Sequence, residues 1–326
     1  MTICSELVEH YDHGVSCLDT GLGRPGLAAC YLLQQNGRLA IIETGIGGTV
    51  PRILQLIENL GYRRDDVDFI IITHVHLDHA GGAGGLMQAL PNARLVVHPR
   101  GAKHMVNPEV LEAGAMAVYG EDRYRATYGE LIPVPENRVL IADDEFELNF
   151  NGRQLKFFDT PGHARHHFCV YDPTSQGIFT GDTLGIVYRE LCHAHKNFVM
   201  PSTTPVQFEP ERLKASMQRL MSLNPRYFYL THYGRVDATD DHVKSMHDSI
   251  DAYMAIAKKF ATVVDRHQQI TEALITYTLA ELAKYRSPIN AHTQEKLIAM
   301  DMSINAQGLE VWLSKEERQS NQGAQA

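Results

Sequence analysis

The chain has 326 residues and a formal net charge of −9, with 44% hydrophobic and 21% charged residues. This length and composition are typical of a globular protein of about two domains with a sizeable core. The acidic balance offers no basic face for a phosphate backbone, and no apolar stretch approaches the roughly 20 residues of a membrane span. We therefore expect neither a nucleic-acid partner nor a membrane partner.

The cysteines and the first residues indicate the compartment. Cysteine occurs at positions 4, 17, 30, 169 and 192, which is an odd number without a CxxC pair. This usage is typical of free thiols in a reducing compartment. The segment from Met1 to His10 has neither a basic start nor an apolar run, so it does not resemble a signal peptide. We expect a cytoplasmic protein.

Short apolar runs predict strands at the beginning of the chain. The expected strands are Val15–Asp19, Leu27–Leu33 and Leu39–Glu43, the last two joined by a hairpin turn at Asn36-Gly37. An amphipathic pattern then predicts a helix from Val50 to Leu60, which Gly61 ends. The chain thus begins as a small meander followed by a helix.

A cluster of metal-ligand side chains follows the apolar run Phe69–Ile72, which predicts a buried strand. From His74 to His79 the sequence reads H-V-H-L-D-H, and glycines come next. Imidazole and carboxylate groups are the usual ligands of zinc and similar metals. In an extended segment His74 and His76 point the same way, while Asp78 and His79 lie where the chain turns. One metal ion is expected, and a second can be accommodated.

The segment after this motif leaves two interpretations open. We expect a short helix over Gly84–Leu90 and a strand over Arg94–His98. Residues 101–130 have an irregular helical pattern, and they either wall a substrate pocket or pack as ordinary structure. His98 and His104 match no motif and are interpreted as structural.

The middle of the chain repeats the plan of an apolar strand that ends in a ligand-type side chain. The expected strands are Val139–Ile141, Glu145–Phe150, Gln154–Phe158, Phe168–Asp172, Gly177–Thr180 and Tyr227–Leu230. His163, Asp182 and His232 follow three of them. A lone histidine is more often structural, but four strand ends of this kind favour a site. Strands and helices in two halves fit two sheets packed face to face with helices outside.

The last third of the chain combines one long loop with helices. Residues 183–208 are irregular, and loops of this length are uncommon unless they are functional. His193 and His195 in this loop are surface residues or line a pocket, and His166 or His167 supports a metal ligand or belongs to the core. The expected helices are Pro210–Leu223, Asp240–His267, Thr271–Tyr285 and Asp301–Leu313, with a frayed end from Ser314 to Ala326.

These motifs together resemble the metallo-β-lactamase-fold hydrolase superfamily, whose pattern runs strand-Asp, HxHxDH, His, Asp, His. The resemblance covers about residues 14–235. It implies an α/β protein with an αββα four-layer sandwich and a C-terminal helical extension. We accordingly expect a catalytic domain at 1–238 and a helical cap or homodimer segment at 239–326. One departure is Glu43, where the family usually has an aspartate that supports the ligands.

The resemblance also assigns metal ligands position by position. It implies two divalent ions, with Zn²⁺ expected and Mn²⁺ or Fe²⁺ as alternatives. The implied ligands are His74, His76 and His163 for the first ion, Asp78, His79 and His232 for the second, and Asp182 as the bridge between them.

This centre would make the protein a hydrolase of small molecules. A metal lowers the pKa of bound water from 15.7 to about 7, so a water shared by two ions would attack a carbonyl as hydroxide. Asp78 and Asp182 are the expected catalytic residues, because both can help to move the proton. The expected bond is of the ester type, a thioester or lactone first and a phosphodiester next.

Substrate contacts are predicted more loosely. Related lactonases use a tyrosine just after the bridging aspartate, and Tyr188 is offset from that spacing. His195 and Tyr233 are further candidates for contact with the substrate. The glutathione-binding signature of glyoxalase II does not occur, and Lys196, Arg189 and Arg235 are the candidates for a CoA phosphate. The alternatives are a mononuclear iron oxidoreductase resembling persulfide dioxygenases, and a binding protein that keeps the fold.

Overall fold

The structure is a computed structural model that describes residues 8–194, 196–203, 206–287 and 289–323. The chain forms two compact units, a sheet unit and a helical unit. The sheet unit comprises the residues up to Asp159 together with His166–Gly181 and Asn224–Asp237. The helical unit comprises Thr160–Arg165, Asp182–Leu223 and the residues from Ala238 onward. The expected functional division at residue 238 stays a prediction.

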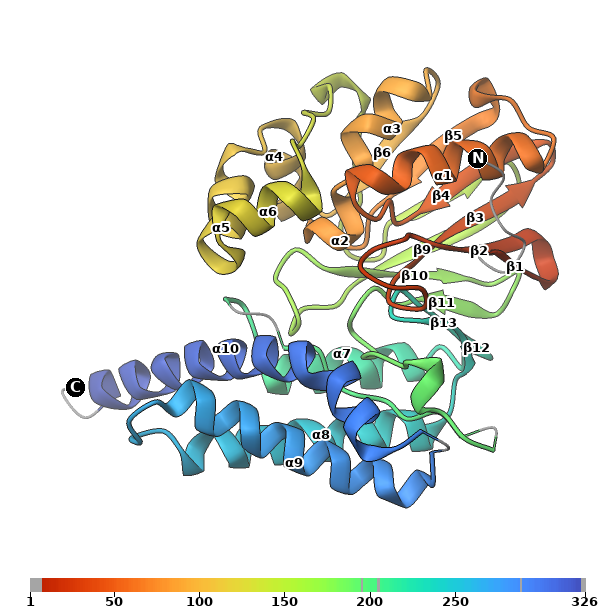
Figure 1. Cartoon of the computed structure of the whole chain (residues 1–326). Coiled ribbons are helices and arrows are strands. Elements are labelled where there is room, and N and C mark those ends of the chain that lie inside the picture. The colour runs from red at the N-terminus through yellow and green to blue at the C-terminus, as the bar shows by residue number, and fades with distance from the viewer. Residues whose placement is uncertain (1–7, 195, 204–205, 288, 324–326) are drawn as a thin grey trace. The chain divides into compact units, whose positions relative to one another are not determined.

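The sheet unit contains two β-sheets (Figure 1). The first has the strand order β1 to β7, with bounds Val8–Tyr11, Val15–Asp19, Ala29–Gln35, Arg38–Ile42, Val67–Ile71, Arg94–Val97 and Val139–Ile141. The second has the order β13-β12-β11-β10-β9-β8, and β8 to β13 span Glu147–Phe150, Arg153–Asp159, Phe168–Asp172, Gly177–Phe179, Tyr227–Leu230 and Gly234–Asp237. The predicted strands are all present, and their ends differ from the predicted ones by at most two residues.

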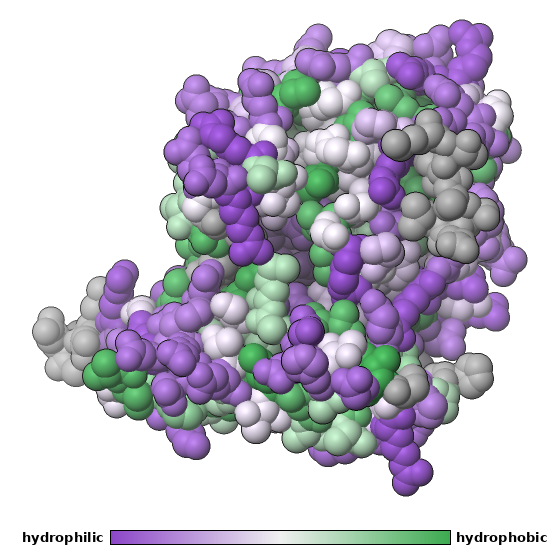
Figure 2. Space-filling view, in the orientation of Figure 1, coloured by the Kyte–Doolittle hydropathy of each residue, from purple (hydrophilic) through white to green (hydrophobic). Residues whose placement is uncertain are grey.

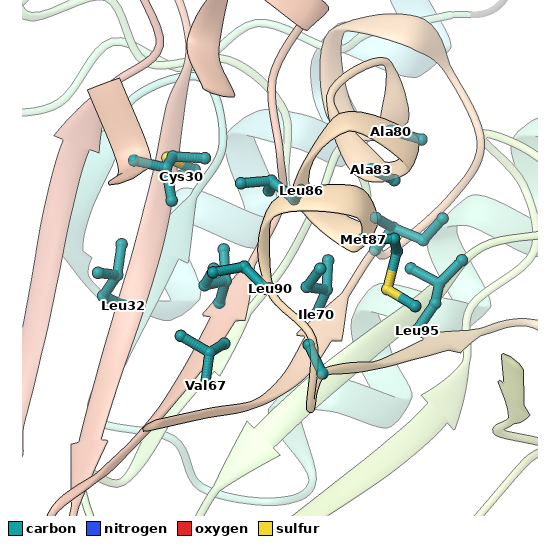
Figure 3. Packing of buried hydrophobic residues seen from close by; sticks show 14 of the residues in the cluster. Cys30, Leu32, Val67, Ile70, Ala80, Ala83, Leu86, Met87, Leu90 and Leu95 are labelled. Carbon is teal, nitrogen blue, oxygen red and sulfur yellow. The ribbon is translucent and has the colours of Figure 1, made fainter. Parts of the chain in front are cut away.

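Helices cover one face of the first sheet. The helices of this unit are α1 (Val50–Asn59), α2 (Leu77–Ala80), α3 (Ala83–Ala89), α4 (Pro99–Val106), α5 (Glu109–Tyr119) and α6 (Glu121–Tyr128). Alternate residues of the strands, such as Leu32 in β3 and Ile70 in β5, form one apolar cluster with Leu86 and Met87 of α3 (Figure 3). Side chains alternate across a strand, so the other set of residues is left for the opposite face.

That opposite face packs against the second sheet. Tyr31 of β3, Ile42 of β4 and Ile71 of β5 belong to a second cluster with Phe157 and Phe179 from β9 and β11. The ring of Tyr31 makes an edge contact with that of Phe179 at 5.2 Å between centroids. The predicted arrangement of two sheets packed face to face, with helices outside, follows from this alternation.

The helical unit differs from the sequence-based expectation in where its helices begin and end. Its helices are α7 (Pro210–Met221), α8 (Asp240–Lys259), α9 (Arg266–Tyr285) and α10 (Ala291–Gly323). The expected single helix over Asp240–His267 is wrong, because the chain breaks between α8 and α9. Thr262, Val263 and Val264 are β-branched residues in that break, and Val264 is 84% exposed.

The last helix was predicted too short at both ends. The Asn290 side chain accepts a hydrogen bond from the backbone N–H of Thr293 at 3.0 Å and so caps α10. The helix begins at Ala291, ten residues before the expected start at Asp301. The expected fraying is wrong from Ser314 to Gly323, because the helix continues to Gly323, and residues 324–326 lie outside the described residues. The hydroxyl of Ser314 bonds the carbonyl of Glu310 one turn earlier in the same helix at 3.0 Å.

Hydrophilic side chains cover much of the face shown in Figure 2. Within the described ranges, no helix is both long enough and apolar enough to cross a membrane.

Candidate metal centre

The first part of the candidate site lies at the end of β5. This strand runs parallel to β4 and β6, and after Ile71 the chain leaves the sheet in a short irregular segment that bends at Thr73 and His74 and leads into α2. His74 is fully buried there, and its Nε2 lies 2.9 Å from Nδ1 of His76. The alternation H-V-H therefore brings two imidazole nitrogens to one point.

A second group of ligand-type side chains comes from α2 and from the end of β12 in the other sheet. Asp78 and His79 lie on the single turn of α2, and His232 follows β12. Oδ2 of Asp78 lies 3.5 Å from Nε2 of His79 and 3.3 Å from Nε2 of His232. One ligand atom from each of these three residues lies within 4.8 Å of the others, a spacing that could hold a metal ion.

Hydrogen bonds at the far ring nitrogens orient both imidazoles of this group. Nδ1 of His232 donates to the carbonyl oxygen of Leu27 at 2.7 Å, and Nδ1 of His79 donates to Oε1 of Glu43 at 3.1 Å. In a neutral imidazole with Nδ1 protonated, Nε2 presents its lone pair, here toward the carboxylate of Asp78. Two imidazole lone pairs around a carboxylate are a donor set that fits a divalent metal ion.

Glu43 connects the two groups. It follows β4 with a left-handed backbone (φ 63°), and its buried carboxylate also accepts a hydrogen bond from the backbone N–H of Thr73 at 3.2 Å. The hydroxyl of Thr73 bonds the same carboxylate and lies 3.0 Å from Nδ1 of His74. Glu43 therefore supports His79 directly and His74 through Thr73.

The helical unit carries the other two predicted ligands. Nε2 of His163 lies 3.3 Å from Oδ2 of Asp182. Nδ1 of His163 donates to the carbonyl oxygen of Ser202 at 3.0 Å, so this ring has the same protonation pattern as the two in the sheet unit. Within this unit, too, an imidazole lone pair faces a carboxylate.

The comparisons with known proteins decide the family. The family model described as the metallo-beta-lactamase superfamily matches residues 23–232. The chain belongs to this superfamily. Its members are mostly metal-dependent hydrolases, and the fold binds divalent metals. The α/β fold class expected from the sequence, with C-terminal helices, is confirmed.

Two relatives and one solved structure show how far the likeness extends. A metallo-beta-lactamase fold-containing protein of Sulfurisphaera tokodaii is 27% identical over 228 residues, which are 68% of this chain and 79% of that protein. A solved structure of an archaeal superfamily protein from Sulfolobus tokodaii covers 92% of this chain and 99% of its own, with a TM-score of 0.64 and 22% identity, and so shows the fold. An N-acyl homoserine lactonase of Bacillus thuringiensis is 25% identical over 59% of this chain and 74% of its own.

A third relative is the atrochrysone carboxyl ACP thioesterase of Aspergillus fumigatus. It is 26% identical over 203 residues, which are 62% of this chain and 49% of the thioesterase. This superfamily member thus resembles a lactonase and a thioesterase at similar, low identity.

The predicted substrate contacts lie in different surroundings. Tyr233 belongs to the apolar cluster between the sheets. Tyr188 is buried in the helical unit, where its hydroxyl donates to the Asp301 carboxylate at 3.0 Å. His195 lies outside the described residues. The guanidinium of Arg235 stacks on the ring of Tyr11 at 4.4 Å, while Arg189 and Lys196 are exposed. The roles of all these residues stay predictions.

Of the other histidines, His167 lies beside the predicted ligand His74, and His98 lies at the start of a helix. The fully buried His167 ring lies 4.7 Å from that of His74, between centroids. Gly181 adjoins it with φ 50°, and a Cβ there would lie 2.5 Å from Nε2 of His167. His98 accepts from the backbone of Arg100 at the start of α4, which fits the structural interpretation.

Sequence reasoning missed the residues that orient the ligands. The hydroxyl of Thr231 lies 3.4 Å from Glu43, as part of the network that includes Thr73. A signal for this pair was present, because Thr-His occurs both at Thr73-His74 and at Thr231-His232. The carbonyl groups of Leu27 and Ser202 gave no such signal, since any residue can supply a backbone oxygen.

Proposed function

We propose that this superfamily member is a metal-dependent hydrolase that cleaves an ester-type bond of a small molecule, a thioester or a lactone. The observation that carries the proposal is the group Asp78, His79 and His232, in which both rings are held with Nε2 toward the carboxylate. The lactonase and the thioesterase among its relatives support the choice of bond.

We also propose the complete centre. In it, His74, His76 and His163 bind one ion, Asp78, His79 and His232 bind another, and Asp182 bridges them. Donors of this kind favour zinc, with manganese or iron as alternatives. Support comes from the repeated pattern in which Nδ1 of an imidazole donates to a fixed oxygen, at Leu27, Glu43 and Ser202. Such outer partners typically accompany metal-binding histidines.

When bound, the ions would supply an acidified water and polarise the scissile carbonyl. The protein's own residues do the rest. The carboxylates of Asp78 and Asp182 hold the proton that leaves the attacking water and can pass it to the leaving group. The buried hydrogen bonds at Nδ1 keep the rings from turning, so the ligand atoms are in place before substrate arrives. This chemistry requires no serine nucleophile.

The test combines metal analysis with hydrolysis. Protein purified without added metal is analysed for elemental content and assayed on a thioester, a lactone and a phosphodiester. We expect two equivalents of zinc or manganese and turnover of the thioester or lactone. Asp182→Asn and His232→Ala should lose metal and activity, whereas Asp248→Asn, at an exposed ion pair with Lys244, should keep both.

Other outcomes would refute the proposal. One equivalent of iron with oxygen uptake would show an oxidoreductase. Protein without tightly held metal would remove the centre itself, and turnover of the phosphodiester alone would overturn the choice of bond.

A further inference from the structure

Ser202 contacts both predicted ligands of the helical unit. Its carbonyl oxygen accepts the hydrogen bond from Nδ1 of His163 at 3.0 Å, and its hydroxyl donates to Oδ2 of Asp182 at 3.4 Å. The position of this one residue therefore sets both the direction of an imidazole and the surroundings of a carboxylate. Ser202 lies in an irregular segment, so no helix or strand fixes it.

The fixation comes from Asn305 in α10. Its Nδ2 donates to the carbonyl oxygen of Pro201 at 3.0 Å, and its Oδ1 accepts from the backbone N–H of Thr203 at 2.7 Å. The carboxamide thus bridges the residues on either side of Ser202, as a neighbouring β-strand would. The Thr203 hydroxyl adds a bond to the backbone oxygen of Asn305 at 2.9 Å.

This contact is buried and rigidly supported. Asn305 is 2% exposed and Thr203 is fully buried. Burial removes competition from water, so an amide that bonds two backbone groups holds them firmly. One turn earlier on α10, Asp301 accepts the hydroxyl of Tyr188 from the start of the same loop. Two residues on one face of α10 therefore hold two separate points of the 183–208 loop.

We propose that Asn305 is a positioning residue of the metal centre. It fixes the Ser202 peptide, and Ser202 in turn orients His163 and contacts Asp182. This inference rests on the proposed function, because it concerns two of the ligands proposed there. It gives the C-terminal helices a role in metal binding that is separate from capping a pocket or forming a dimer.

Substitutions at Asn305 separate this role from general stability. Asn305→Ala removes both bonds and leaves the Pro201 carbonyl and the Thr203 N–H without that partner. Asn305→Asp keeps size and the acceptor for Thr203, but replaces the donor with a carboxylate oxygen facing the Pro201 carbonyl. Both variants should displace Ser202, and the second does so without creating a cavity.

Met302→Ala is the matched control. Met302 is fully buried in α10, three residues from Asn305, and its sulfur lies 3.4 Å from the hydroxyls of Tyr253 in α8 and Thr278 in α9. Its truncation weakens the packing of α10 and leaves the bonds to Pro201 and Thr203 in place. It therefore reports what loss of stability alone does to the metal centre.

The experiment measures Co²⁺ binding to the full chain by competition with a chelator, together with the visible spectrum of the bound Co²⁺ and the melting temperature. We expect both Asn305 variants to weaken the affinity of one ion by roughly 10–100-fold and to change its spectrum. Met302→Ala should lower the melting temperature at least as much, yet keep affinity and spectrum within twofold of wild type.

Three results overturn the inference. Affinity could fall in all variants in proportion to the melting temperature, which would make the role purely structural. Asn305→Ala and Asn305→Asp could bind like wild type. The affinity could fall while the spectrum of the remaining bound ion stays unchanged. The proposed function fails separately, when wild-type protein itself binds no Co²⁺ or Zn²⁺ and hydrolyses no ester.

Discussion

Glu43→Gln tests how the site holds its histidines. The buried carboxylate of Glu43 accepts from Nδ1 of His79 at 3.1 Å and from the Thr231 hydroxyl at 3.4 Å through Oε1. Through Oε2 it accepts from the backbone N–H of Thr73 at 3.2 Å. Glutamine keeps the size of this side chain but replaces one acceptor oxygen with a donor, and it removes the charge.

The magnitude follows from these contacts. If the glutamine oxygen faces His79, its NH₂ group faces the Thr73 N–H, so one buried hydrogen bond is lost at a cost of about 1–3 kcal/mol. The remaining bond to His79 is no longer charge-assisted, and such bonds have about half the strength. Loss of an outer partner of this kind lowers metal affinity by about 10–100-fold. We expect a decrease in this range for the ion bound by His79.

The assay is competition between the protein and a chelator for Zn²⁺, with the melting temperature of the metal-free protein as the second readout. Glu147→Gln is the control, because Glu147 is an exposed glutamate of the same unit that pairs with Lys156. Glu43→Asp, which restores the residue usual in the family, should retain more affinity than Glu43→Gln. An affinity of Glu43→Gln within twofold of wild type would refute the role given to Glu43.

Three further substitutions test residues that are not themselves proposed ligands. Arg153→Met breaks the fully buried ion pair with Asp172 and should cost about 3–5 kcal/mol of unfolding free energy in urea, because a carboxylate remains buried without its main partner. Burial lowers the pKa of His242 from 6.5 to about 4. The unfolded chain therefore binds this proton at higher pH, and stability should fall by up to about 3 kcal/mol as pH falls from 6.5 to 4; His242→Gln should flatten this part of the urea-midpoint profile. Gly181→Ala should lower the melting temperature more than Gly37→Ala, since both have positive φ but at Gly37 an added Cβ meets no atom of the described residues within 4 Å, and crowding costs about 1–3 kcal/mol.

Local patterns were sufficient to predict the two sheets and to locate a cluster of metal-ligand side chains, while the assignment of each ligand stays a prediction. Nearly every residue of β2, β3 and β4 is buried, with Leu18 and Leu32 toward the helices and Cys17 and Tyr31 toward the second sheet. Because both faces of these strands are apolar, they appear in the sequence as short apolar runs. The H-V-H-L-D-H string was recognisable as a group of ligand-type side chains because its six residues are contiguous.

Features that depend on distant parts of the chain were not predictable in this way. The apolar period continues through Val264, although α8 already ends at Lys259 and α9 begins only after Asp265, which has an αL conformation. Asn305 lies in the middle of a helix and is polar, which in a sequence reads as an ordinary exposed position. Its role depends on its hydrogen bonds to Pro201 and Thr203, which are about 100 residues away in the sequence.

Several contacts within the helical unit link its C-terminal helices to the segment that begins with Asp182, and three of them involve side chains of α8 and α10. His242 of α8 bonds the carbonyl oxygen of Leu184 at 2.8 Å, Asp301 of α10 accepts from Tyr188, and Asn305 holds the residues around Ser202. A loop of this length has many conformations when free, and ordering it costs entropy for each residue. Because buried helices hold this loop before any ligand binds, the loop loses its conformational entropy during folding and not when metal binds. Substitution of Asn305 should therefore alter metal affinity even though α10 supplies none of the proposed ligands.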